Sequence, residues 1–254
     1  MAAGKSPGKS KVTLKADDFG SLYKGFTAPI SRFDCGRKCA PLNGGDPVCC
    51  STQNAVPVVH KVEFDFLKTR TDLWSKFKPY DYATRQIVEE LTSDCTAIHC
   101  KGARFCERDN RTIACRGFPF YPYITRQRQF VGIGTYWVFE DRCWVMSNLQ
   151  VVDQKFVEEF VATYEALFVK DPSEFTTYVD FSASARRVFS RWKRDIALLG
   201  RNGDLLVVDP KTGDIRPGKT RDYPKVAPFD SEKSYREAVK EAGGEVPSNG
   251  LRAA

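Results

Sequence analysis

CGRKCAPLNGGDPVCC, residues 35 to 50, brings four thiols into one short, turn-rich stretch of the chain. Glycine and proline between the thiols favour turns, and the stretch has too few apolar residues to build a core of its own. Segments of this kind are usually held by bound metal or by disulfides. The sequence therefore predicts that the first half of the chain is organised around its cysteines.

The chemistry of the nine cysteines depends on the compartment. No run approaches the ~20 apolar residues of a membrane span, and the N-terminus lacks the apolar segment of a signal peptide. We therefore expect a soluble, cytoplasmic protein with no membrane partner, where reducing conditions disfavour structural disulfides. Metal binding is then the leading interpretation, and thiol redox chemistry and simple core packing remain as alternatives. The five cysteines outside the opening stretch are Cys95, Cys100, Cys106, Cys115 and Cys143.

The composition fits a globular protein with a modest basic excess. The chain has 254 residues and a formal charge of +7, and part of that excess lies in residues 1–24, which resemble a disordered basic tail. No RNA-binding or helix-turn-helix pattern accompanies these lysines, so nucleic acid is an unlikely partner. At this length the chain can bury a stable core without disulfides or metal, so its cysteines are not needed merely to stabilise a small domain.

Periodicity predicts mixed secondary structure in the first half. Residues 58–66 alternate apolar and polar, as in a half-buried strand, with His60 on the apolar side. A buried histidine with one hydrogen bond is the simpler interpretation of His60, and a metal ligand is the alternative. Residues 70–78 and 81–91 are expected to be helices, and residues 130–139 a strand.

Beyond Val152 the character of the sequence changes, because no further cysteine occurs and helix signals become regular. Asp153 is predicted to cap one helix, and Asp171-Pro172-Ser173-Glu174 is a typical start for another. A helix through Val188 is expected to end near Gly200, with a hairpin over 204–216 and a short helix over 231–242. The expected organisation is an α+β fold: a tail (1–24), a cysteine-rich metal-binding domain with irregular loops (25–152), a helical and β-hairpin extension packed on it (153–225), and a loosely attached tail (226–254).

Soft thiolate ligands suit zinc, iron and iron–sulfur clusters, and eight or nine of them can supply two four-ligand sites. Cys49 and Cys50 would point to opposite faces of an extended chain, so they can share one ion only if the backbone turns there. No Cys-x-x-Cys pair and no His-Glu-x-x-His pattern occurs, although His99 beside Cys100 is a possible nitrogen ligand. Gly132-Ile133-Gly134 and Ser190-Arg191-Trp192-Lys193 are interpreted as structural rather than functional matches.

The vicinal cysteines, the spaced cysteines after them and the segment CRGFPF at 115–120 resemble the YkgJ-like cysteine-cluster proteins, described as zinc- or iron-chelating domains. The resemblance covers about residues 33–145, and the loop over 40–48 is longer here than is usual in that family. It implies an iron–sulfur cluster or iron, or alternatively zinc, as cofactor. By matching position it implies eight metal ligands, with Cys95 an alternative to Cys100: Cys35, Cys39, Cys49, Cys50, Cys100, Cys106, Cys115 and Cys143.

Three functions are compatible with these residues. The first is a metal-binding protein that holds iron or zinc through its cysteines. The second is an S-adenosylmethionine-dependent enzyme that modifies proteins, because flagellin lysine methylases carry a similar cysteine cluster; no catalytic residue is assigned. The third is a module with a protein partner, whose contact surfaces would be the aromatic run 118–123 and the basic residues over 186–194.

Overall fold

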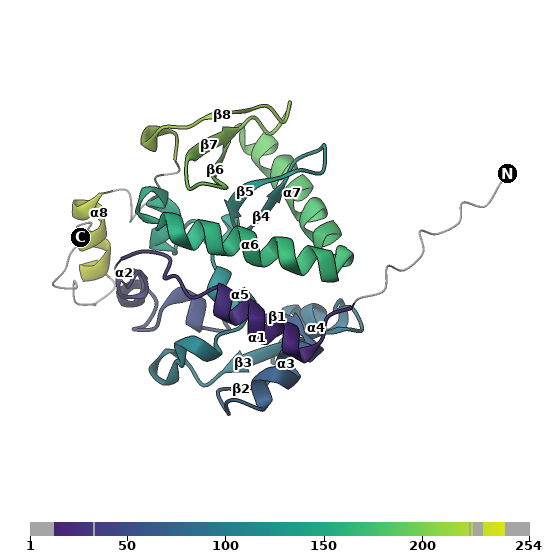
Figure 1. Ribbon diagram of the computed structural model, residues 1–254. Coiled ribbons are helices and arrows are strands. Elements are labelled where there is room, and N and C mark those ends of the chain that lie inside the picture. Colours follow the sequence, from purple (N-terminus) through teal and green to yellow (C-terminus); the bar gives the residue numbers. More distant parts are fainter. Residues whose placement is uncertain (1–12, 33, 224, 226–230, 242–254) are drawn as a thin grey trace, which may run out of the picture.

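The structure is a computed structural model that describes residues 13–32, 34–223, 225 and 231–241. Helices and two antiparallel sheets alternate along these residues, which confirms the predicted α+β class (Figure 1). Within this described part of the chain, no helix is long and apolar enough to cross a membrane.

The smaller sheet has three antiparallel strands in the order β1-β3-β2. Its strands are β1 (Val58–His60), β3 (Cys95–Cys100) and β2 (Trp74–Lys76), and His60 pairs with Cys95 in the register. Helices α1 (Ala16–Gly25) and α3 (Lys61–Lys68) lie beside this sheet in the lower half of Figure 1. A further short helix, α4 (Tyr82–Glu89), lies between β2 and β3 in the chain, as predicted for residues 81–91.

The larger sheet has five antiparallel strands in the order β4-β5-β6-β7-β8. Along β6, for example, the side chains alternate between two apolar clusters. Phe120 and Leu199 face the cluster that contains α6 (Gln154–Lys170), whereas Tyr121 and Leu198 face the one that contains α7 (Pro172–Trp192). The two helices therefore cover opposite faces. The strands are β4 (Phe120–Ile124), β5 (Phe130–Thr135), β6 (Ile196–Gly200), β7 (Leu205–Val208) and β8 (Ile215–Pro217).

The two long helices begin where the sequence predicted. The Asp153 side chain accepts a hydrogen bond from the Lys155 N–H and caps α6 (Gln154–Lys170). Asp171 accepts from the N–H groups of Ser173 and Glu174 and caps α7 (Pro172–Trp192). Such caps satisfy backbone donors that have no partner inside the helix. They also fix where each helix starts, and hence where Asp171 and Glu174 lie.

The Gly-x-Gly pair at residues 132 and 134 has a structural role in strand β5, so nucleotide binding is not needed to explain it. A Cβ at Gly132 would clash with the carbonyl of Leu199 on β6, and one at Gly134 would press on the Tyr121 ring. These glycines allow close strand approach, which is a structural role. Lys193, the end of the Ser-x-x-Lys match, is the left-handed C-cap residue of α7.

Several expectations from the sequence were wrong in detail. The predicted strand 58–66 is β1 followed at once by α3, the predicted helix 70–78 contains β2, and the segment that ends at Gly200 is β6 rather than helix. Short apolar stretches fit both the helical and the strand period. Here β2 and β6 form strands because they pair with β3 and β5, respectively.

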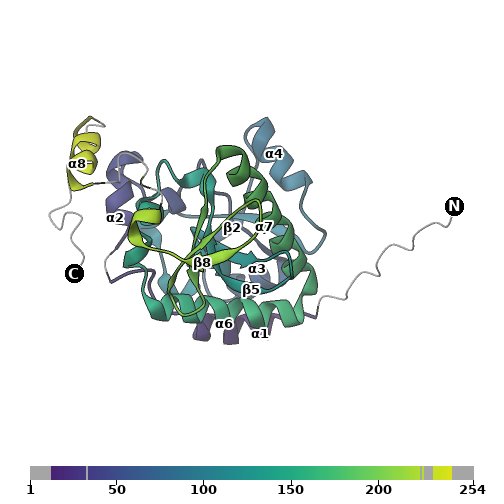
Figure 2. The ribbon, with the colours of Figure 1, turned by 90° about the horizontal axis from the view of Figure 1, so that it is seen from above.

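The division into segments also differs from the expected one. Residues 16–25 of the expected tail form α1, because Phe19, Leu22 and Tyr23 give it a buried face. The boundary at 152 runs through one sheet, since β4 pairs through β5 with β6. Within the expected C-terminal tail, α8 (Glu232–Glu241) buries Val239 and lies beside α2 (Gly36–Cys39), at the left of Figures 1 and 2. Residues 1–12, 226–230 and 242–254 lie outside the described residues.

Candidate metal centre and cavity

The family resemblance implied eight cysteines as ligands, and they come from separate short elements and loops between residues 35 and 143. Cys35 and Cys39 flank α2 (Gly36–Cys39), and Cys49 and Cys50 end a 3-10 turn over Val48–Cys50. Cys100 ends β3, and Cys106 follows a 3-10 turn. Cys115 lies in α5 (Ile113–Gly117), and Cys143 precedes a 3-10 turn over Trp144–Ser147. We call these eight residues the cysteine cluster: Cys35, Cys39, Cys49, Cys50, Cys100, Cys106, Cys115 and Cys143.

These thiols are close enough to influence one another's ionisation. Burial raises the pKa of Cys143, and the neighbouring thiols of Cys39 and Cys35 raise it further. Burial also raises the pKa of Cys115 to about 12; the Arg111 guanidinium opposes this rise, whereas the thiols of three other cluster residues add to it. The cluster therefore has two parts, one around Cys143 and one around Cys115.

The vicinal pair lies between the two parts. Burial raises the pKa of Cys39, with a smaller contribution from Cys50, and the pKa of Cys49 is raised mainly by its hydrogen bond to Cys50, with smaller contributions from Cys115 and Cys35. The backbone turns here, so the Sγ atoms of Cys49 and Cys50 lie 3.8 Å apart. Two sulfurs bound to one tetrahedral ion at about 2.3 Å each would be separated by roughly the same distance.

Backbone groups hold some of the sulfurs in place. The Val48 N–H donates to Cys39 Sγ at 3.5 Å, and the Gly102 N–H donates to Cys100 Sγ at 3.3 Å. Both contacts favour a thiolate over a thiol. Among the described residues, no three cysteine sulfurs lie within 4.8 Å of one another. An ion that takes three or four of these sulfurs would therefore require some side chains to move closer.

The ninth cysteine lies apart from the cluster. Burial raises the pKa of Cys95, and the groups that raise it further are the carboxylates of Glu174, Asp94 and Asp171 rather than thiols. The Nδ1 atom of His99 is 3.1 Å from the Ser75 hydroxyl. Cys95 therefore differs from the cluster residues, because besides burial its pKa is raised by carboxylates, whereas those of Cys115 and Cys143 are raised by other thiols.

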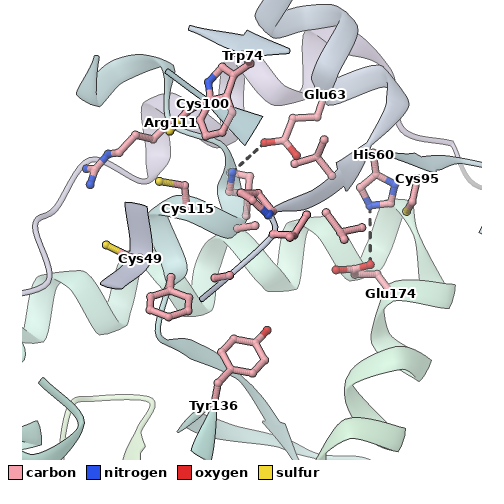
Figure 3. Close-up of a pocket in the computed structure, with 18 of the residues that line it drawn as sticks. Cys49, His60, Glu63, Trp74, Cys95, Cys100, Arg111, Cys115, Tyr136 and Glu174 are labelled. Atoms are coloured by element: carbon pink, nitrogen blue, oxygen red, sulfur yellow. Dashed lines mark hydrogen bonds and ion pairs between the residues drawn. The ribbon is translucent and has the colours of Figure 1, made fainter. Parts of the chain in front are cut away.

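A cavity of about 630 Å³ begins at the cysteine cluster and extends to the start of α7 (Figure 3). Five cluster residues line one end: Cys49, Cys50, Cys100, Cys106 and Cys115. His60, Asp171 and Glu174 line the other end. An aromatic wall joins the two ends and consists of Phe118, Phe120, Tyr136, Phe139, Tyr164, Tyr178 and Phe181.

Glu63 is a buried acid of this cavity that the sequence did not reveal. Its Oε1 accepts hydrogen bonds from the Tyr23 hydroxyl at 2.7 Å and from the Ile113 N–H at 2.8 Å. Burial raises the pKa of Glu63 to about 7, and these two hydrogen bonds oppose the rise. A strand over 58–66 would have placed Glu63 outside, whereas helix α3 turns it inward beside Phe64 and Leu67.

His60 faces two carboxylates across the narrow end of the cavity. Its Nε2 is 3.7 Å from Asp171 Oδ2 and 3.8 Å from Glu174 Oε2. His60 is 6% exposed, and within the described chain its Nδ1 has no hydrogen-bond partner. The expected single hydrogen bond of a buried histidine is therefore absent among these residues.

The two surfaces considered for a protein partner are partly internal. Phe120, Tyr121 and Tyr123 of the aromatic run are each 1% exposed. Arg186 of the basic helix is buried and donates to the Tyr123 hydroxyl and to the Ile124 carbonyl, and Arg194 pairs with Glu140.

Comparison with known proteins gives little guidance. No family model and no solved structure matches the chain. A stretch of 102 residues, 39% of this chain, is 28% identical to part of the protein translocase subunit SecA of Methylococcus capsulatus. That stretch spans 11% of the translocase subunit, about a ninth of its length.

Proposed function

We propose that the protein binds iron, as an iron–sulfur cluster, or zinc through its cysteine cluster. The observation that carries this proposal is the selective convergence of the thiols. Eight cysteines distributed over residues 35–143 gather along one region, and Cys95, which the resemblance left as an alternative to Cys100, lies with carboxylates instead. Packing alone gives no reason for eight thiols from separate loops to adjoin one another.

The chemistry of the donor set also favours a metal. Neighbouring thiolates repel, so buried thiols in this arrangement stay protonated unless a cation replaces their protons. The 3.8 Å separation of the vicinal sulfurs matches the spacing on a tetrahedral ion. Arg111 lies where it opposes the rise in pKa of both Cys115 and Cys106, so it would offset part of the negative charge of a thiolate centre.

The two parts of the cluster suggest two centres. Cys35, Cys39 and Cys143 would serve one, Cys100, Cys106 and Cys115 would serve the other, and the vicinal pair would bind one ion together, as the 3.8 Å separation of its sulfurs allows. A location of this kind, between loops rather than on one motif, agrees with the absence of a Cys-x-x-Cys pair.

Anaerobic purification followed by metal and sulfide analysis and a visible spectrum tests the proposal. We expect stoichiometric iron with inorganic sulfide and a broad visible absorption, or stoichiometric zinc in a colourless protein. Cys115→Ser should lower the metal content, whereas the matched control Cys95→Ser should retain it. Wild-type protein without stoichiometric iron or zinc, or an equal loss in both variants, would contradict the proposal.

A second candidate is an S-adenosylmethionine-dependent enzyme that contains the metal centre. The observation in its favour is the cavity of about 630 Å³ next to the cluster, within the size range of pockets that take small organic ligands. Calorimetric titration of the metal-loaded protein with S-adenosylmethionine tests it. Binding heat that disappears on placing a bulky residue in the wall, as in Thr177→Trp, supports this candidate, and the absence of heat in wild type removes it.

A further inference from the structure

His60, Asp171 and Glu174 form a compact group at the end of the cavity away from the cysteine cluster. One ligand-type atom from each residue lies within 4.8 Å of the others. The three residues come from two parts of the chain: His60 ends β1, and the other two start α7. Figure 3 shows the His60 ring directed at the Glu174 carboxylate, while the sulfurs of Cys49, Cys100 and Cys115 lie on the opposite side of the picture.

The group is incomplete as a hydrogen-bonded network. Distances of 3.7 and 3.8 Å from Nε2 to the two carboxylates are too long for hydrogen bonds. His60 is more than nine-tenths buried, and in the described part of the chain its Nδ1 also lacks a partner. A buried imidazole that points at two acids without bonding to either calls for a further group between them.

The charges of the group are also unbalanced. Two acidic side chains, Asp171 and Glu174, lie beside one imidazole. Within the described chain, neither Asp171 nor Glu174 pairs with a lysine or arginine. Buried carboxylates are stable when a cation is coordinated or paired with them.

The spacing suits a metal ion. With bonds of about 2.1 Å, the nitrogen and oxygen ligands of a tetrahedral ion lie roughly 3.4 Å apart, slightly less than the observed separations. Asp171 remains free to bind because its cap to α7 uses Oδ1, whereas Oδ2 faces His60. Glu174 does not reach back to the Asp171 N–H, which already donates to the Leu167 carbonyl.

We propose that His60, Asp171 and Glu174 bind a divalent cation of the Mn²⁺, Fe²⁺ or Zn²⁺ class at a second metal site, separate from the cysteine cluster. Imidazole with two carboxylates is a donor set that these ions accept, and it is harder than the thiolate set. Three protein ligands leave at least one coordination position open, and here that position faces the cavity. The site does not depend on whether the cysteines bind metal.

Manganese is the probe that separates this site from the thiols, because Mn²⁺ prefers oxygen and nitrogen ligands. The full chain, as purified with its thiol-bound metal, is titrated with Mn²⁺ while the EPR signal of the free ion is followed. We expect one bound Mn²⁺ per chain in wild type and in Cys115→Ser. Glu174→Gln should bind at least about tenfold more weakly, since even outer-shell changes cost about that much. Asp180→Asn, an exposed acid on α7, is the matched control and should bind normally.

A second readout identifies the nitrogen ligand directly. A coordinated imidazole couples its nitrogen to the Mn²⁺ spin in pulsed EPR, and the chain has two histidines. We expect this coupling in wild type and in His99→Ala, but not in His60→Ala. Circular dichroism of each variant shows whether it has folded.

Four results would overturn the proposal. Three of them are wild type that leaves all Mn²⁺ free, folded Glu174→Gln that binds like wild type, and bound Mn²⁺ that shows no imidazole coupling. The fourth concerns the thiols. If Cys115→Ser alone abolishes Mn²⁺ binding, the ion is at the cysteines and the second site is refuted. Failure of the cysteine cluster to hold iron or zinc, in contrast, would leave the Mn²⁺ result unchanged.

Discussion

Glu63 should make the stability of the protein depend on pH. Burial raises the pKa of this carboxyl from its ordinary 4.5 to about 7. Because the folded state then holds the Glu63 proton more tightly than the unfolded state, the stabilisation is complete below about pH 4.5 and is lost as the pH rises through about 7. The difference between the two pKa values corresponds to roughly 3 kcal/mol in the free energy of unfolding.

Glu63→Gln removes this titration and keeps the shape. The amide oxygen can still accept from the Tyr23 hydroxyl and the Ile113 N–H. We therefore expect the free energy of unfolding of wild type to fall between about pH 5 and about pH 8, and that of the variant to fall by up to roughly 3 kcal/mol less. Some slope should persist, because the pKa of Glu174 is raised in the same direction.

Urea denaturation at a series of pH values measures both slopes. The matched control is Glu158→Gln, which changes an exposed glutamate on α6 and should leave the wild-type slope intact. A Glu63→Gln slope equal to that of wild type would refute the reasoning. It would mean that the buried carboxyl is ionised in the folded state at all these pH values.

Other outcomes follow from the caps, the strand approach and the thiols. Gly132→Ala should destabilise the fold, because its Cβ meets the Leu199 carbonyl, whereas Gly25→Ala, with open space around it, should not; denaturant midpoints compare them. Asp153→Ala should cost about 1 kcal/mol in urea denaturation by removing the cap of α6. A strong chelator should lower the melting temperature of metal-loaded wild type more than that of Cys115→Ser. Equal shifts in the two proteins would mean that metal bound at the cysteine cluster does not stabilise the fold.

The second half of the fold was the more predictable from sequence. Asp153 and Asp171 mark helix starts because their side chains accept hydrogen bonds from backbone groups a few residues later. Interactions between residues close in sequence can be predicted without knowledge of the fold. Residues 58–78 were harder, because β1 and β2 are three residues each and exist through their pairing with β3. The alternation over 58–66 also concealed a helical face, since Phe64 and Leu67 are three apart.

The two candidate sites also differ in how well the sequence predicts them. The cysteines that converge were selected by the resemblance to the YkgJ-like proteins, which can be recognised without any knowledge of the fold. Asp171 and Glu174 were interpreted only as a helix start, and their meeting with His60 depends on how α7 docks against β1. A signal was present in the three-residue spacing, which places both carboxylates on one side of the first turn of α7.

The large sheet has a consequence for how the chain is made. Its strands β4 and β5 are synthesised well before β6, and so are all eight cluster thiols. A nascent chain at that stage has β5 as an open edge, which is prone to pair with other chains. Strand β5 therefore remains an open edge until residues 196–200 have been translated and pair with it. Until then the cysteine cluster belongs to a chain whose large sheet is incomplete.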